Sequence, residues 1–267
     1  MRIAYSENGE YFESPKVVET PHTYEEGRNL FVETAKVAAN GREVKMLCGG
    51  IAGPFDEKKR SLVGSPNLKD WIGKPFLSEI SKEFGAPVKI ENDSALVGLG
   101  ESKFGAGRGD RIVAYITVST GFGGVRIVNQ KIDDKSVGFE PGHQIIDADK
   151  TLVPDVSGLG ADCILSGKEV EKRMVMKPRE ITDPEFWEKM AKYLAFALNN
   201  VAVFWSPDSI VLGGSMITGS PAIPVERVEE YLKEILKIYP EIPKIKKAEL
   251  GDFGGLYGAL AMLGEGK

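Results

Sequence analysis

Residues 111–129, RIVAYITVSTGFGGVRIVN, decide the fold of this chain. Arg111–Val118 is almost continuously apolar and predicts a buried strand. It runs into Ser119–Gly124, where glycines let backbone N–H groups turn toward an anion with no Cβ in the way. Val125–Asn129 predicts the hairpin partner of that strand. The stretch thus predicts a buried strand that ends in a glycine-rich loop.

Two more glycine-rich loops follow predicted strands. Gly49–Gly53 comes after Val44–Cys48, and Gly213-Gly214 comes after Ser209–Leu212. Each loop alone is better explained by close packing, but together they stand at strand ends, where α/β folds bind ligands. None matches GxGxxG after a first strand or GxxxxGK[ST], so neither a Rossmann nor a P-loop protein is indicated.

Strands alternate with helices along the chain, which is the pattern of an α/β protein. Residues 1–6 and 11–19 predict a hairpin around Asn8-Gly9, and Thr23 with Glu26 predicts a capping box at the start of a helix. A further strand is expected at 88–90, and further helices at 75–84, 94–104, 186–205, 225–238 and 254–263. We expect an N-terminal lobe of residues 1–92 and a C-terminal lobe of residues 93–267, with the last helix, about 254–264, able to pack back on the first lobe.

Composition excludes several classes of protein. The 267 residues are 42% apolar and 27% charged, as in a globular protein, and the net charge of −5 argues against a nucleic-acid partner. Two distant cysteines, Cys48 and Cys163, exclude a disulfide framework and a four-thiolate zinc site. No signal peptide or membrane-spanning stretch is present, so we expect a cytoplasmic protein.

Seven short motifs stand in a specific order. They are GIAGPFD at 50–56, SPNLKDW at 65–71, ENDSA at 91–95, TVSTGFGG at 117–124, EPGH at 140–143, VLGGS at 211–215 and GGLYGA at 254–259. In this order they resemble motifs of the ROK family, which comprises sugar kinases such as glucokinases together with sugar-responsive repressors. The resemblance runs from about residue 1 to residue 262. It implies the actin/hexokinase-like (ribonuclease H-like) α/β fold, with two lobes and a cleft between them.

The resemblance also implies site residues. Asp93 would be the general base that takes the proton of the attacking sugar hydroxyl. The other implied sugar-binding residues are Asn67, Asn92, Glu140, His143 and Asp162. The implied nucleotide-binding residues are Thr120, Gly121 and Gly123 at the phosphates, and Gly213 and Gly214 at the adenosine. Asp162 stands where the family has a glutamate, just before Ser166-Gly167, and is shorter by one methylene.

Three features depart from the family pattern. Family kinases open with a strand carrying DxGGT, which organises Mg²⁺ and approaches the ATP phosphates, and no DxGGT occurs in the 267 residues. Two explanations stay open: a shortened hairpin in which Met1–Ser6 replaces that strand, or a start further upstream. The family's cysteine cluster after the histidine of EPGH is missing, so no zinc is expected. Val125-Arg126 replaces the last glycine of the phosphate motif, which would either crowd the nucleotide or place a cation beside its phosphates.

Two functions follow from the resemblance. The first is an ATP- and Mg²⁺-dependent sugar kinase that acts on a hexose or N-acylhexosamine hydroxyl. The second is a sugar-binding pseudokinase, because phosphoryl transfer depends on positioning and charge neutralisation that DxGGT would supply. A repressor would need a winged-helix segment before the first strand. A sugar and a nucleotide are the expected partners, and we expect a homodimer, with no nucleic acid and no membrane.

Overall fold

The structure, a computed structural model, describes residues 1–65, 67–136, 138–154 and 156–264. Its contacts define two compact units, which are described separately. Unit 1 comprises Met1–Lys103, Asp134–Gly138 and Leu250–Lys267, and unit 2 comprises Phe104–Asp133 and Phe139–Glu249. The division of the chain into an N-terminal lobe of residues 1–92 and a C-terminal lobe of residues 93–267 stays a prediction.

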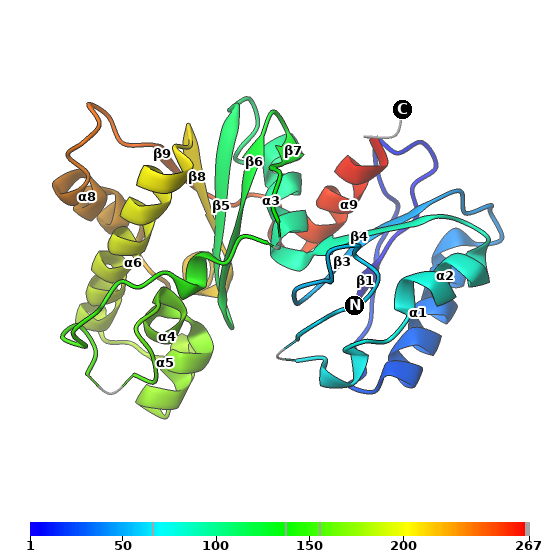
Figure 1. Ribbon diagram of the computed structural model, residues 1–267, viewed down its shortest axis with the longest axis horizontal. Coiled ribbons are helices and arrows are strands. Elements are labelled where there is room, and N and C mark those ends of the chain that lie inside the picture. The colour runs from blue at the N-terminus through cyan, green and yellow to red at the C-terminus, as the bar shows by residue number, and fades with distance from the viewer. Residues whose placement is uncertain (66, 137, 155, 265–267) are drawn as a thin grey trace. The chain divides into compact units, whose positions relative to one another are not determined.

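A five-stranded sheet forms the centre of unit 2, in the order β7-β6-β5-β8-β9 (Figure 1). Its strands are β5 (Ile112–Val118), β6 (Phe122–Val128), β7 (Lys131–Ile132), β8 (Ser209–Gly213) and β9 (Lys244–Lys247). β5 pairs antiparallel with β6 and parallel with β8, which pairs parallel with β9. Because every residue of β5 except Thr117 is buried, β5 is the central strand that its apolar sequence predicts.

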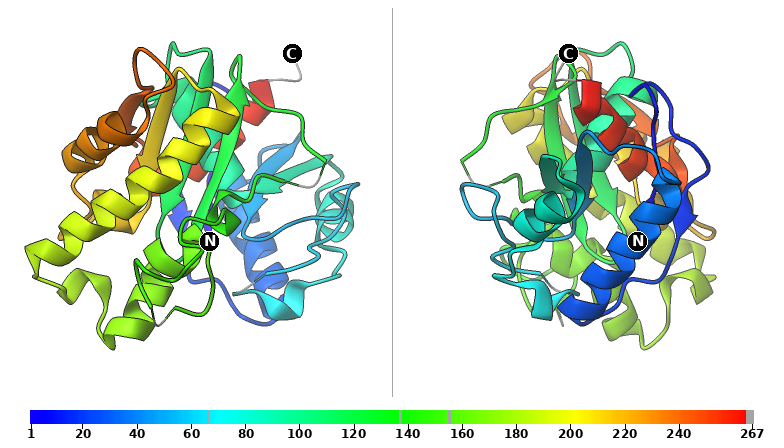
Figure 2. Two further views of the ribbon diagram at one scale, coloured as in Figure 1. Left: turned by 60° about the vertical axis from the view of Figure 1, so that its left-hand side comes forward. Right: turned by 90° about the vertical axis from the view of Figure 1, so that its right-hand side faces the viewer.

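The described helices of unit 2 are α4 (Ala161–Leu165), α5 (Gly167–Met174), α6 (Pro184–Trp205), α7 (Ser215–Thr218) and α8 (Val225–Ile235). The 3₁₀ turn η2 (Pro141–His143) lies between β7 and α4, and η3 (Pro178–Glu180) lies between α5 and α6. α6 begins where the Asp183 side chain accepts the N–H of Glu185, with Pro184 in the first turn, and it ends at Ser206 in the left-handed conformation. The left view of Figure 2 shows α6, yellow-green, beside α8, orange-brown, on the sheet.

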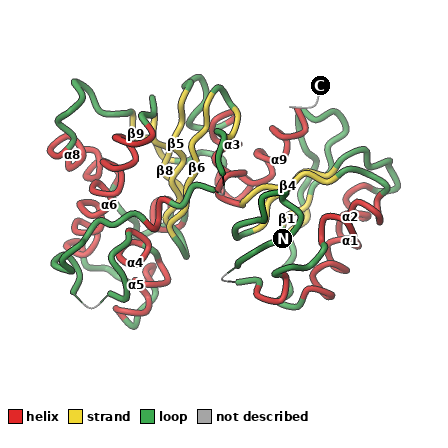
Figure 3. The backbone as a smooth tube through the Cα atoms, viewed as in Figure 1, coloured by secondary structure: helices red, strands yellow, loops and turns green. Residues whose placement is uncertain are grey.

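Unit 1 contains two separate two-stranded sheets (Figure 3). β1 (Arg2–Ile3) and β2 (Lys16–Val17) pair antiparallel, and β3 (Leu47–Ile51) and β4 (Val88–Asn92) pair parallel. The predicted N-terminal hairpin is therefore confirmed as a pairing, although each strand is only two residues long.

The helices of unit 1 are α1 (Tyr24–Ala39), α2 (Phe76–Phe84), α3 (Asp93–Phe104) and α9 (Gly254–Gly264), with 3₁₀ turns η1 (Lys69–Trp71) and η4 (Gly251–Phe253). The rings of Tyr24 and Trp71 meet edge to face, 5.4 Å apart, in a core that includes Phe76 and Ile80. A Cβ at Gly27 would overlap with the Trp71 ring, so α1 needs a glycine at this position. α9 packs against β3.

Three local predictions differ from the structure. β3 begins three residues later than expected and includes Gly49 and Gly50, because its ladder continues as far as the pair Ile51–Asn92. β6 likewise begins at Phe122 rather than Val125, so the second half of the glycine motif is strand. The capping box at Thr23 was wrong: the Thr23 hydroxyl donates to the Glu26 carboxylate at 2.6 Å and caps no backbone N–H.

Candidate active site

The junction of β4 and α3 presents Asp93, the predicted base. Asn92 ends β4, and its side-chain oxygen accepts the N–H groups of Ser94 at 3.0 Å and Ala95 at 3.2 Å. Asn92 therefore caps α3. The Asp93 carboxylate accepts the N–H of Ser94 at 2.8 Å and is partly exposed to solvent.

The surroundings of Asp93 favour its protonated form. Desolvation by nearby protein atoms raises the pKa of the Asp93 carboxyl, and hydrogen bonds from the backbone N–H groups of Ser94 and Asp93 limit the rise. The carboxyl thus combines access to solvent with a raised proton affinity. A general base at a strand end needs this combination to take a proton from a weakly acidic hydroxyl.

Asn67 and Asn92 stand in segments that converge on the loop after β3. The amide of Asn92 donates to the carbonyl of Gly53 at 3.3 Å. The hydroxyl of Ser65 donates to the carbonyl of Ala52 at 2.9 Å and accepts the N–H of Leu68 at 3.2 Å. Asn67 lies within this turn and is exposed, which leaves its amide accessible to a ligand.

Unit 1 also contains a charge cluster that sequence reasoning missed. Glu91, only 8% exposed, pairs with the ammonium of Lys59 and lies 3.8 Å from that of Lys135. Burial and the nearby Lys135 lower the pKa of Lys59. Glu91 directly precedes Asn92 in the sequence. Lys59, Glu91 and Lys135 are far apart in the chain, so no sequence spacing predicts the cluster.

In unit 2, the turn between β5 and β6 forms the predicted phosphate loop. Ser119 donates its N–H to the carbonyl of Gly121 at 2.8 Å, which closes a tight turn with Thr120 and Gly121 exposed at its tip. The N–H groups of Gly167 and Lys168, at the start of α5, donate to the carbonyls of Ser119 at 2.7 Å and Thr120 at 3.2 Å. Gly123 lies further along, inside β6, so it is less accessible than the motif predicts.

The predicted adenosine-side glycines lie at the end of β8. An ideal Cβ on Gly213 would lie 2.5 Å from the Tyr115 hydroxyl, and Gly214 has a φ of +88° against the carbonyl of Val118. Both positions therefore require glycine to let β8 turn beside β5. The hydroxyls of Ser119 and Ser215 lie 3.1 Å apart, so the phosphate-side and adenosine-side loops are linked by a side-chain hydrogen bond.

Glu140 precedes the 3₁₀ turn η2, and His143 is its last residue. Both side chains are exposed, and the N–H of His143 donates to the carbonyl of Glu140 at 3.1 Å. Asp162, in the first turn of α4, accepts the N–H of Phe122 at 2.7 Å. Unit 2 therefore brings Asp162 together with the phosphate loop, whereas Asn67, Asn92 and Asp93 belong to unit 1.

Val125 and Arg126 both make contacts within unit 2. Val125 is fully buried, and the Arg126 guanidinium pairs with Asp133 and donates to the carbonyl of Trp205 at 2.9 Å. Arg126 thus connects strand β6 to the end of α6.

Within residues 1–65, 67–136, 138–154 and 156–264, no group of three or more histidines, cysteines and carboxylates is arranged to hold a metal ion. Across the same residues, no helix combines the length and the apolar character needed to cross a bilayer.

Comparison with known proteins places this α/β fold among sugar kinases. The ROK family model matches residues 1–265. The N-acetyl-D-glucosamine kinase of Histophilus somni (strain 129Pt) is 25% identical over 278 residues, covering 92% of this chain and 89% of that protein. The ROK hexokinase of Thermus thermophilus superposes with a TM-score of 0.82 at 25% identity, over 97% of this chain and 94% of that chain.

A ROK glucokinase from Streptomyces griseus, solved in complex with glucose and AMPPNP, superposes with a TM-score of 0.75 at 24% identity, over 96% of this chain and 93% of that one. The fold is therefore the actin/hexokinase-like fold of sugar kinases. The chain belongs to the ROK family.

Proposed function

We propose that this protein is an ATP-dependent sugar kinase that transfers the γ-phosphoryl group to a hydroxyl of a hexose or N-acylhexosamine. The observation that carries the proposal is the β4–α3 junction, where Asn92 caps the helix and leaves Asp93 with an accessible carboxyl of raised pKa. Relatives that are N-acetylglucosamine kinases and a hexokinase support the same reaction class.

In the proposed reaction, Asp93 acts as general base. Its carboxylate takes the proton of the attacking sugar hydroxyl while the new O–P bond forms to the γ-phosphorus and the bond to the leaving β-phosphate oxygen breaks. ADP leaves, and Asp93 returns the proton to solvent. A raised pKa brings the carboxylate closer to the proton affinity that such a transfer needs at neutral pH.

The sugar is proposed to bind through the polar side chains that the family motifs indicate. Amide and carboxylate groups that face vicinal hydroxyls discriminate strongly, because a missing hydroxyl leaves a buried polar group unpaired. The residues proposed for this role are Asn67, Asn92, Glu140 and His143.

The nucleotide is proposed to bind to unit 2. The exposed tip at Thr120 and Gly121, with Gly123 behind it, would hold phosphate oxygens, and Gly213 with Gly214 would lie against the adenosine. Mg²⁺ would accompany ATP and neutralise its phosphates. The described part of this chain offers no cluster of carboxylates for that ion, and no step of the proposed reaction is assigned to it.

A second candidate function is a sugar-binding pseudokinase. It is favoured by the absence of DxGGT from these 267 residues and, in the described part of unit 1, by the pairs β1–β2 and β3–β4, which form two separate sheets. Such a protein would bind sugar through the same polar residues and would transfer no phosphate.

An assay of ADP production separates the two functions. Purified protein is mixed with ATP, Mg²⁺ and each of a panel of hexoses and N-acylhexosamines, and the wild type is compared with Asp93→Asn and with a matched control, Asp149→Asn, at an exposed site outside the motifs. The kinase proposal predicts sugar-dependent ADP from the wild type and the control and none above background from Asp93→Asn. Saturable sugar binding without turnover in any of the three would establish the pseudokinase.

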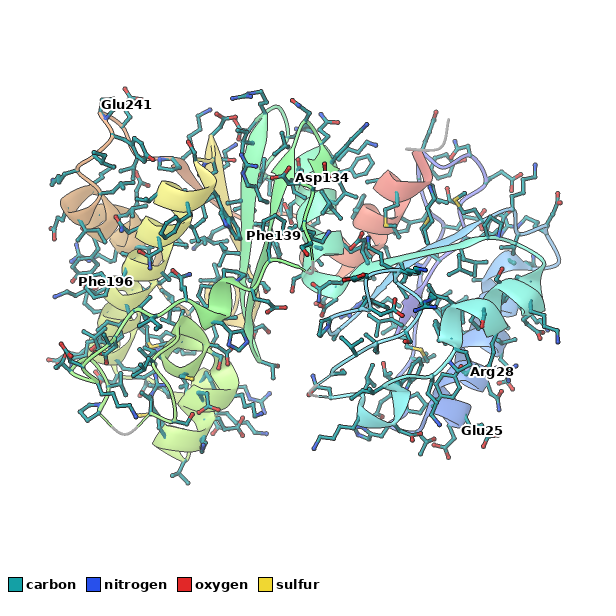
Figure 4. All side chains as sticks on the ribbon, viewed as in Figure 1. Glu25, Arg28, Asp134, Phe139, Phe196 and Glu241 are labelled. Atoms are coloured by element: carbon teal, nitrogen blue, oxygen red, sulfur yellow. The ribbon has the colours of Figure 1, made fainter. Side chains whose placement is uncertain are left out.

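The proposal includes a cytoplasmic homodimer. The second half of α6, residues 193–205, contains no charged residue, and its face opposite the core exposes Val203 and Phe204, the latter by 80%. Phe196 projects from the same helix (Figure 4) and lines a cavity of about 360 Å³ with Ile145 and Ile235. A helix segment without charged residues and with an exposed apolar face is typical of a surface that a second copy covers.

A further inference from the structure

Asp162 lies between two segments that the motifs give to different ligands. Its Oδ1 accepts the N–H of Phe122 at 2.7 Å, directly after the turn tip at Gly121. An ideal Cβ on Gly121 would lie 3.4 Å from that oxygen, so the carboxylate lies against the phosphate loop. An ideal Cβ on Gly142 would lie 3.3 Å from the Cβ of Asp162, so η2 packs against the same side chain.

The backbone that carries Asp162 is held firmly. The N–H of Ala161 donates to the carbonyl of Gln144 at 2.9 Å, and the carbonyl of Asp162 accepts the N–H of Ser166 at 3.1 Å. Ala161, Ile164 and Leu165 of the same short helix are fully buried. The carboxylate is therefore presented to the phosphate loop from a rigid support.

The phosphate loop is held from two sides. On one side, the N–H groups of Gly167 and Lys168 donate to the carbonyls of Ser119 and Thr120. On the other side, the Asp162 carboxylate accepts the N–H of Phe122. A hydrogen bond to a charged acceptor is stronger than one between neutral groups, so Asp162 sets the orientation of the Gly121–Phe122 peptide.

We propose that Asp162 is a positioning residue for the nucleotide, which it serves by fixing the phosphate loop, and that it affects nucleotide affinity more than sugar affinity. This inference rests on the proposed kinase function. It differs from the role that the motif predicts, a direct contact to the sugar. The side chain length supports the difference, because a glutamate would carry its carboxylate one methylene further and away from the Phe122 N–H.

Three variants separate the two roles. Asp162→Ala removes the acceptor, Asp162→Asn keeps an oxygen acceptor at the same distance, and Asp162→Glu moves the carboxylate outward. The dissociation constants of ADP, of glucose and of N-acetylglucosamine are measured by calorimetry for each variant, for the wild type and for the control Asp149→Ala. We expect Asp162→Ala and Asp162→Glu to weaken ADP binding by about tenfold, and Asp162→Asn by no more than about threefold, with sugar affinities within about twofold of the wild type.

Hydrogen exchange of the Phe122 amide gives a second readout that a general loss of stability would not mimic. We expect faster exchange at Phe122 in Asp162→Ala and Asp162→Glu than in Asp162→Asn, with the exchange of the β5 amides unchanged. This comparison holds even if Asp162→Ala folds poorly, because the Asn and Glu variants retain a polar side chain of similar size.

Two results would overturn the inference alone: ADP binding as tight in Asp162→Glu and Asp162→Ala as in the wild type, or a loss confined to sugar affinity. A wild type that binds sugar and no ADP would overturn both this inference and the kinase function. The two failures are therefore distinguishable in the same set of titrations.

Discussion

The side-chain oxygen of Asn92 accepts the N–H groups of Ser94 and Ala95, so Asn92 caps the helix that Asp93 begins. Asp93 lies between the cap and these two donors, and its carboxylate stays accessible at the first turn. Within the ENDSA motif, Asn92 thus caps the helix, and the carboxylate of Asp93 is accessible for the proposed proton transfer.

Replacing Asn92 should test this division. Asn92→Ala removes the cap and should lower the free energy of unfolding by about 1 kcal/mol, whereas Asn92→Asp keeps an acceptor and should cost less. Urea unfolding of both variants measures the difference. Equal stability of Asn92→Ala and the wild type would show that the cap contributes nothing.

The raised pKa of Asp93 predicts the pH dependence of turnover. The base must be ionised, so kcat should rise with pH through the pKa of Asp93, and this acidic limb should lie above the 3.8 of an ordinary aspartate. A pH profile of kcat on saturating sugar and ATP measures it. An acidic limb at or below the ordinary value would contradict the raised pKa.

The same shift predicts the pH dependence of stability. Because folding raises the pKa of Asp93, the folded protein binds this proton more tightly, and the resulting stabilisation is complete below the ordinary pKa and is lost as pH rises through the raised pKa. Asp93→Asn should therefore gain stability relative to the wild type as pH rises from about 4 to about 7. Thermal unfolding of both proteins across that range tests this. If the stability of Asp93→Asn fell relative to that of the wild type as pH rises, the prediction would be contradicted.

The close contact of Gly27 with the Trp71 ring predicts that a larger residue at position 27 destabilises the protein. A Cβ at Gly27 would overlap with the Trp71 ring, while an ideal Cβ at Gly49 would meet no atom within 4 Å. Gly27→Ala should therefore destabilise the protein by about 1–3 kcal/mol, and Gly49→Ala should cost much less. Denaturant unfolding measures the loss of stability in each variant. An equal loss in both would contradict the prediction, because it would mean that the Trp71 ring moves aside freely.

The apolar face of α6 predicts an effect of charge on assembly. Phe204→Asp should shift a dimer toward monomer, because an aspartate would be buried without a partner. Val175→Asp, at a residue that is 92% exposed, is the matched control. Light scattering after size-exclusion chromatography measures the mass. A Phe204→Asp protein that stays dimeric would show that this face of α6 is not part of the interface.

Much of the fold could be predicted from local pattern. The apolar run before Ser119 defines β5, and the long amphipathic segment that ends at Trp205 defines α6, because burial imposes a periodicity on both. The residues at which strands begin and end were harder to predict from the sequence. Gly49, Gly50, Gly123 and Gly124 read as loop by propensity, yet they lie in strands, because ladder pairing with β4 and β5 outweighs the low strand propensity of glycine.

The candidate site was predictable as a set of motifs and less so as a set of contacts. The order of the motifs ENDSA, TVSTGFGG and EPGH along the chain, by its resemblance to the ROK family, predicts Asp93, Thr120 and His143 as site residues from the sequence alone. The pairing of Glu91 with Lys59 and Lys135, and the bond from Phe122 to Asp162, join residues far apart in sequence, so no local spacing encodes them.

The central claim is that Asp93 supports phosphoryl transfer to a sugar. Its most direct test is mass spectrometry of the sugar after incubation with ATP and Mg²⁺, with ADP quantified in the same sample. The account predicts one sugar phosphate formed per ADP in the wild type and in Asp149→Asn, and neither product above background in Asp93→Asn. Sugar phosphate formed at the wild-type rate by Asp93→Asn, or sugar bound by the wild type and recovered unphosphorylated, would contradict it.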